Sequence, residues 1–112
     1  MRLRRKSQFE AVYARGRRFG DGFFTVIARP NDEGPRLGLA VSTKAAGNSV
    51  QRNRIRRVVR ESFRLRQREL PQMDLVVSAR AGVRSAANAV LRASLDTLWT
   101  RVAHQCDLRQ HC

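Results

Sequence analysis

The stretch SVQRNRIRRVVRESFRLR, Ser49–Arg66, contains seven arginines and a single carboxylate. Its apolar residues recur at the spacing of one helical face, which predicts an amphipathic helix with Ile55 directed at a core. Asn48 precedes the stretch as an N-cap, and Gln51 occupies the second position of a capping box. Like charges one turn apart repel each other, so the helix is expected to need a neutralising partner outside the chain.

The arginines fall mainly on the side of this helix that faces away from the core. At about 100° per residue, four residues lie opposite Ile55: Asn53, Arg57, Arg60 and Arg64. Three more arginines flank this outward stripe: Arg52, Arg54 and Arg56. A solvated surface would carry interspersed glutamates, but only Glu61 and Glu69 are present. The stripe, about 16 Å long, is therefore interpreted as a surface that follows several phosphates.

The overall charge indicates the same class of partner. The chain has 112 residues, with 23 Lys+Arg against 9 Asp+Glu and a net charge of +14. Only Lys6 and Lys44 are lysines, and the guanidinium fork of arginine matches phosphate bidentately. This composition implies a nucleic acid or an anionic membrane surface as partner. No apolar run approaches the roughly 20 residues of a membrane-spanning helix, so a cytoplasmic protein is expected.

The amino-terminal half predicts one helix followed by strands. Ser7 has the position of a helix cap, and Gly16 is expected to end this first helix. Residues 23–30 and 36–42 have strand composition, and the turn sequence NDEG between them suggests an antiparallel hairpin. A weaker strand pattern lies at residues 17–19.

The carboxy-terminal half predicts a strand and a last helix. Residues 74–79, DLVVSA, carry few charges and are expected to form a central strand. Ser85 has the position of a cap for the last helix, whose inward face carries four apolar residues: Leu91, Leu95, Leu98 and Val102. The order of elements predicts a single α+β sandwich domain at residues 1–103 and a flexible tail at 104–112.

Neither a metal site nor a catalytic site is assigned. His104, Cys106, His111 and Cys112 lie together in the tail, but their spacing matches no closed zinc finger. The few carboxylates are scattered, and the chain has no glycine-rich phosphate loop and no nucleophile elbow.

The aromatic residues raise a separate question. Phe63 has core spacing, whereas Phe9 and Tyr13 lie one turn apart on the first helix. Their rings are compatible with packing against the sheet and with stacking on unpaired bases. The residue pattern leaves both alternatives open.

The segment GNSVQRNRIRRVVRESFR, residues 47–64, resembles the bacterial ribonuclease P protein subunit family. That family is marked by an Arg-Asn-Arg motif at the start of a basic helix, here Arg52, Asn53 and Arg54. The resemblance extends to FEAVYARGRR, RLGLAVSTK and DLVVSAR, and covers roughly residues 3–102 in the expected order.

The resemblance implies an αβββαβα fold, a two-layer sandwich with an unusual left-handed parallel crossover through the basic helix. It implies endonucleolytic 5′ maturation of tRNA by a partner RNA with bound Mg²⁺, in a cytoplasmic ribonucleoprotein without an obligate protein partner. Six residues match the RNA-contacting helix of the family: Arg52, Asn53, Arg54, Arg56, Arg57 and Arg60. Arg64 extends the same outward stripe.

The resemblance also implies that the 5′ leader of precursor tRNA lies in a groove between the sheet and the first helix. Phe9 and Tyr13 match aromatic positions of that groove, and Lys44 matches a basic position near its end. The chain departs from the family pattern at Thr43, where a second basic residue is frequent, and at Ile27, where an aromatic ring can occur.

Two other classes of protein share some of these features. A small basic RNA-binding protein of the translation apparatus would carry the same charge and helix, without nuclease association and without an aromatic-lined groove. A peripheral membrane module is disfavoured because the long helix directs arginines, and not insertable apolar residues, outward.

Overall fold

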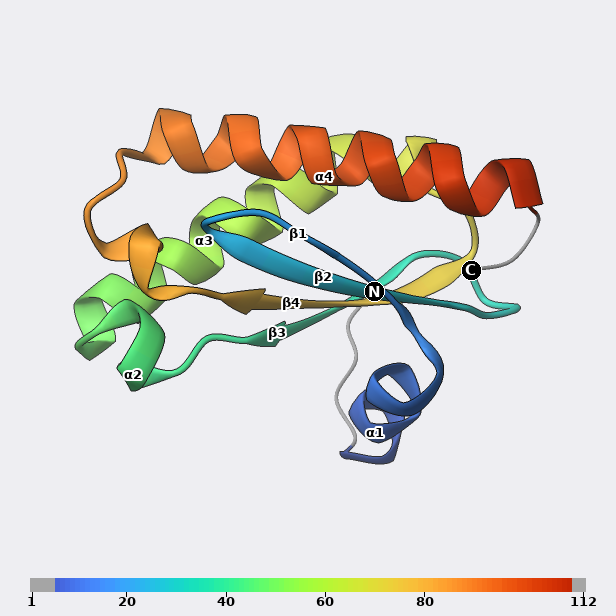
Figure 1. Ribbon diagram of the computed structural model, residues 1–112, viewed down its shortest axis with the longest axis horizontal. Coiled ribbons are helices and arrows are strands. Elements are labelled where there is room, and N and C mark those ends of the chain that lie inside the picture. Colours follow the sequence, from blue (N-terminus) through green and yellow to red (C-terminus); the bar gives the residue numbers. More distant parts are fainter. Residues whose placement is uncertain (1–5, 110–112) are drawn as a thin grey trace.

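The computed structural model describes residues 6–109 as a four-stranded sheet with helices on both faces (Figure 1). The helices are α1 (Lys6–Arg15), α2 (Thr43–Ala46), α3 (Ser49–Arg66) and α4 (Asn88–Arg109). The strands are β1 (Arg17–Gly20), β2 (Phe24–Pro30), β3 (Arg36–Ala40) and β4 (Met73–Ala79). Two 3₁₀ turns, η1 (Gln67–Glu69) and η2 (Ala81–Arg84), follow α3 and β4. The expected α+β class is confirmed, and α2 and both 3₁₀ turns are additions to the prediction.

The order of strands in the sheet is β1-β2-β4-β3. The expected hairpin between β2 and β3 is wrong, because β4 lies between them, antiparallel to β2 and parallel to β3. Leu75, Val76 and Val77 of β4 are fully buried, and the central position gives their backbone groups partners on both sides. The parallel connection from β3 to β4 runs through α3, as the resemblance implied. The left-handed sense of this crossover stays a prediction.

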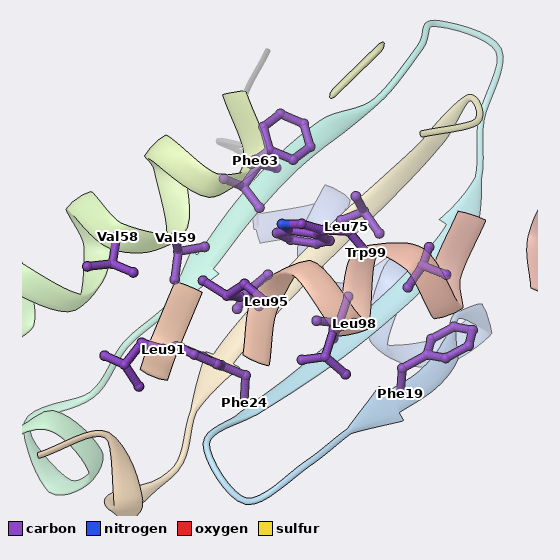
Figure 2. Packing of buried hydrophobic residues seen from close by; sticks show 14 of the residues in the cluster. Phe19, Phe24, Val58, Val59, Phe63, Leu75, Leu91, Leu95, Leu98 and Trp99 are labelled. Atoms are coloured by element: carbon purple, nitrogen blue, oxygen red, sulfur yellow. The ribbon is translucent and has the colours of Figure 1, made fainter. Parts of the chain in front are cut away.

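The main core lies between the sheet and the helices α3 and α4. The predicted inward residues of both helices are buried, and Figure 2 shows Phe63, Leu95 and Trp99 directed into the same space. The Trp99 indole Nε1 donates to Ser62 Oγ at 2.9 Å, and its ring forms a T-shaped pair with Phe63, with the ring centroids 6.0 Å apart. The expected sandwich of helices on a small sheet is therefore confirmed.

Helix α1 lies on the opposite side of the sheet, called the outer face below (Figure 1). Val12 packs there against Ile27 and Val76. Gly16 permits this close approach, because a Cβ at that position would lie 2.5 Å from Ile27 Cγ2 and from the Val12 carbonyl oxygen. The absence of a side chain at Gly16 therefore allows the end of α1 to lie directly against β2.

The helix ends follow the predictions in part. Asn48 caps α3 as expected, with its Oδ1 accepting from the Gln51 backbone N–H at 3.0 Å. Ser7 lies within the first turn of α1 instead of preceding it. Ser85 does not cap α4, because α4 begins only at Asn88. Ser85 instead follows the 3₁₀ turn η2, in which Val83 is buried.

The last helix is longer than expected. It runs to Arg109, so residues 104–109 of the predicted flexible tail are helical. His111 and Cys112 lie outside the described residues, as does the rest of the tail beyond Arg109.

Candidate nucleic-acid interface

The outward stripe of α3 lies where the sequence places it. All four of its residues are exposed: Asn53, Arg57, Arg60 and Arg64. The flanking arginines Arg52, Arg54 and Arg56 are half-buried, and the opposite side of the helix is buried in the core. The predicted orientation of α3 is therefore confirmed, whereas RNA contact by these residues stays a prediction.

Arg54 is engaged within the protein. Its guanidinium donates to Asn88 Oδ1 at 2.6 Å and to the carbonyl oxygens of Val83 at 2.9 Å and Ala86 at 3.3 Å. Its Nε donates to Gln51 Oε1 at 3.0 Å. Three of these acceptors lie 29 to 34 residues away in sequence, so helical spacing alone gave no sign of them. Arg54 joins α3 to the segment that leads into α4.

A hollow of about 450 Å³ lies between the first halves of α3 and α4. Eight residues line it: Val50, Asn53, Arg54, Arg57, Val58, Glu61, Asn88 and Arg92. Arg92 is exposed on α4 and was not singled out from the sequence, where it is one of many isolated arginines. The hollow extends the basic surface from α3 to α4.

Along each strand, residues that point to the outer face alternate with residues that point into the main core. Ile27, Val76 and Gly38 align across β2, β4 and β3, and α1 covers this row. In the next row, Thr25 aligns with Ser78, and Ser78 with Ala40. Small side chains therefore form the surface of the sheet beside α1, where Arg80 Nε donates to Thr25 Oγ1 at 3.1 Å.

The two aromatic residues of α1 differ in exposure. Phe9 is half-buried against the cluster of Val12, Ile27 and Val76, whereas Tyr13 is 46% exposed. Ile27, expected on the groove strand, is 2% exposed and supports α1 from below, so its side chain does not line an open groove. Tyr13 is thus the ring that the structure leaves accessible to a base.

Lys44 is exposed on the short helix α2, just beyond the end of β3. Arg84 fixes this helix by donating to the carbonyl oxygens of Lys44 at 2.6 Å, Ala45 at 3.0 Å and Thr43 at 3.2 Å. These contacts cross 39 to 41 residues and could not be predicted from local sequence. They hold Lys44 at the edge of the outer face.

A buried ion pair lies at the other end of the outer face. Arg36 donates from Nε and Nη2 to the two carboxylate oxygens of Asp74, at 2.6 and 2.9 Å. The hydrogen bonds that Arg36 donates to the Asp74 carboxylate raise the pKa of Arg36. Asp74 is only 1% exposed, and Asn31 also donates to it. The carboxylate is therefore neutralised within the protein and presents little charge to an anionic ligand.

The described side chains bring no three His, Cys, Asp or Glu residues together around one point. Within the same part of the chain, no helix is long and apolar enough to cross a membrane. The site consists of arginines, a tyrosine, a lysine and small polar residues, a set suited to binding a nucleic acid.

Comparison with known proteins identifies the family. A family model described as Ribonuclease P matches residues 1–103. The chain belongs to the ribonuclease P protein family. The ribonuclease P protein component of Thioalkalivibrio sulfidiphilus is 42% identical over 107 residues, covering 95% of this chain and 89% of the relative. That of Escherichia coli O157:H7 is 46% identical over 102 residues, covering 90% and 86%.

Solved structures of ribonuclease P proteins share the fold. The Staphylococcus aureus protein superposes with a TM-score of 0.84 at 29% identity, covering 91% of this chain and 94% of that chain. The Thermotoga maritima protein gives 0.80 at 28% identity, covering 91% and 97%. Membership of the ribonuclease P protein family implies association with ribonuclease P RNA. It supports the ribonuclease P interpretation over an RNA-binding protein of the translation apparatus.

Proposed function

We propose that this protein binds the catalytic RNA of ribonuclease P through the outward side of α3 and holds the 5′ leader of precursor tRNA beside α1. The RNA, with bound Mg²⁺, then cleaves the leader from the tRNA in the cytoplasm. The observation that carries the proposal is the exposed stripe of α3, whose guanidinium groups lie on a rigid helix packed against the core.

The stripe suits a folded RNA because its charges are fixed in space and follow a line. Phosphate neutralisation by arginine releases counterions, and this release supplies most of the affinity at low salt. Arg92, which lines the hollow beside Arg57, widens the surface across two helices. A surface of this width suits a duplex or a junction better than a single strand.

The outer face suits a single strand. Tyr13 offers an exposed ring, the sheet beside it has a floor of small residues, and Lys44 offers a cation. Stacking of a base on an aromatic ring contributes on the order of 1–3 kcal/mol and tolerates differences in sequence. Leaders that vary among tRNAs are accommodated by such contacts.

The part assigned to the protein is positioning and charge neutralisation. Asp21 accepts hydrogen bonds from the backbone N–H groups of Phe23 and Phe24, and Asp74 is held by Arg36 and Asn31. These carboxylates have structural partners, which supports assigning Mg²⁺ to ligands supplied by the RNA. The bound protein lowers the Mg²⁺ concentration that the RNA needs, since its arginines replace counterions.

The proposal is tested by reconstitution with the ribonuclease P RNA of the same organism at low Mg²⁺. Leader removal from precursor tRNA is expected with both subunits and not with protein that has been freed of RNA. Cleavage by RNA-free protein, or no stimulation of the RNA at any Mg²⁺ concentration, would contradict the proposal.

A further inference from the structure

A second basic hollow lies at the edge of the sheet formed by β1, on the side of α4. It measures about 300 Å³ and is lined by seven residues: Arg17, Arg18, Phe19, Thr100, Arg101, His104 and Gln105. The lining contains three guanidinium groups and no carboxylate. We call this hollow the edge site.

Two of the guanidinium groups converge on one aromatic ring. The Cζ atoms of Arg17 and Arg101 lie 5.6 and 5.9 Å from the centroid of Phe19. Phe19 is 4% exposed and belongs to the main core, so its ring is a fixed support (Figure 2). Arg101 also donates to the Gly20 carbonyl oxygen at 3.2 Å. The Phe19 ring thus gives both guanidinium groups a fixed support at the rim of the hollow.

These charges are not neutralised by the described part of the protein. Among the described side chains, no ion pair joins Arg17, Arg18 or Arg101 to a carboxylate. Holding guanidinium groups together without a carboxylate is unfavourable unless an anion joins them. Planar, donor-rich groups of this kind match the oxygen atoms of a phosphate.

The edge site is continuous with the surface proposed for the leader. Arg18 aligns with Ile27 across β1 and β2, so it flanks the row that α1 covers. Figure 1 shows the chain passing from α1 directly into β1, with α4 across the sheet on the other side. Arg15, exposed in the last turn of α1, precedes this edge, and α4 packs on β1. Positive charge therefore runs from the end of α1 around β1 to α4.

We propose that the edge site binds phosphate groups of the single-stranded precursor tRNA leader, beyond the segment that lies beside Tyr13. This inference rests on the proposed function and extends it by a second leader subsite. The first subsite stacks bases, whereas the edge site contacts the backbone. Longer leaders therefore gain affinity in two steps, and the second step depends on salt more steeply than the first.

The test measures the affinity of the reconstituted holoenzyme for precursor tRNAs of graded leader length. Arg18→Ala is the primary variant, because Arg18 is exposed and removal of its side chain leaves the Phe19 contacts intact. Arg101→Gln is the second, with thermal unfolding measured to verify its fold. Arg68→Ala removes one exposed positive charge elsewhere and is the matched control.

With long leaders, a variant that combines Arg18→Ala with Arg101→Gln is expected to lose on the order of fivefold in affinity. Its salt slope should fall by about 0.7 for each single-strand phosphate that the variant no longer neutralises. Short leaders, mature tRNA and the free RNA subunit should bind as they do to the wild-type protein. Unchanged affinity for every leader, or an equal loss for mature tRNA, would overturn the inference, and so would weaker binding of the RNA subunit alone.

The failure of this inference is distinguishable from failure of the proposed function. If Tyr13→Ala weakens binding of short leaders while the edge variants bind all leaders normally, only the edge site is refuted. If the wild-type holoenzyme binds mature and precursor tRNA equally, leader binding itself is refuted, and the edge site with it.

Discussion

The guanidinium group of Arg54 donates a hydrogen bond to Asn88 Oδ1 at 2.6 Å, which joins α3 to the first residue of α4. The same group satisfies the carbonyl oxygens of Val83 and Ala86 in the preceding connection. An arginine of the Arg-Asn-Arg motif therefore stabilises the scaffold that presents the other arginines. Loss of Arg54 should therefore mainly lower the stability of the fold, whereas loss of an exposed arginine should mainly weaken RNA binding.

Arg54→Ala is expected to lower the free energy of unfolding by about 1–3 kcal/mol, because it leaves part-buried carbonyl oxygens without a donor. Arg54→Lys should restore little of this loss, since an ammonium group cannot reproduce the fork. Urea unfolding monitored by circular dichroism measures both variants. Wild-type stability of Arg54→Ala with weakened RNA binding would show that Arg54 acts on the RNA instead.

Arg57→Ala is expected to weaken binding to the RNA subunit while the free energy of unfolding stays within about 0.5 kcal/mol of wild type, because Arg57 is exposed. The slope of log K against log salt should fall by about 0.9 if Arg57 neutralises one phosphate of a duplex. Filter binding over a range of salt concentrations measures this slope. Arg68→Ala is the control for loss of one charge, and an equal change in both variants would refute a specific role for Arg57.

Tyr13→Ala is expected to weaken binding of leader-bearing precursor tRNA by an amount on the order of 1 kcal/mol, the lower range for one stacked base. Tyr13→Phe retains the ring and should bind as wild type. Affinity for mature tRNA should stay constant in both variants. We prefer this change to one at Phe9, because Phe9 packs against Val12 and its removal also costs stability. Equal losses for mature and precursor tRNA would argue against stacking on the leader.

Gly16→Ala is expected to destabilise the protein by about 1–3 kcal/mol through overpacking. The new Cβ would lie 2.5 Å from both Ile27 Cγ2 and the Val12 carbonyl oxygen, so the end of α1 and its position on the sheet must both shift. Leader affinity should fall with it, whereas binding of the RNA subunit through α3 should persist. Gly22→Ala, where a Cβ would meet no atom within 4 Å, is the matched control. Thermal unfolding and the two binding assays test the prediction.

Asp21 makes part of the stability depend on pH. Burial raises the pKa of its carboxyl group, but hydrogen bonds from Ser94, Phe24 and Phe23 and the charge of Arg80 outweigh burial and lower the pKa below 3.8. A carboxylate with a lowered pKa stabilises the fold above its unfolded pKa, and this contribution is lost as the pH falls through the folded pKa.

Asp21→Ala should therefore reduce the free energy of unfolding at pH 7 by about 1 kcal/mol, a value discounted for partial exposure of the carboxylate. The difference from wild type should shrink below about pH 4. Urea unfolding across this pH range measures it, with the exposed Asp32 as the site of a control Ala substitution. A difference that grows on acidification would contradict the assignment.

The sequence predicted α3 well because three independent features agreed on it. The apolar spacing fixed its inward side, Asn48 fixed its start, and the arginines occupied the remaining surface. The pairing of β2 with β3 failed for the opposite reason. A turn between two strands determines where the chain reverses, but not whether a later strand enters between them.

The sequence could predict the place of a site residue where helical spacing alone exposes its side chain. It could not predict the place of a residue whose side chain is fixed by hydrogen bonds to segments far away in the sequence. Arg57 is an example of the first kind, since periodicity places it outward. For Tyr13 the residue pattern left packing and stacking both open, and only the structure shows that its ring is 46% exposed. Arg54 and Arg84 are examples of the second, because their acceptors belong to segments about 30 to 40 residues away. Ile27 was expected on the groove strand from the family resemblance, which could not show that α1 would cover its side chain in this chain.

The central place of β4 has a consequence for the way the chain acquires its structure. β2 and β3 lie on either side of β4, so the sheet stays in two unconnected parts until residues 73–79 arrive. During synthesis, the amino-terminal half leaves the ribosome without its central pairing partner, and closure must bring together segments far apart in the chain. The arginine helix lies between β3 and β4, so the same event that completes the sheet fixes this helix on it. Before that step a nascent chain would carry the arginines without the rigid surface that arranges them, and ordered recognition of RNA begins only once β4 is in place.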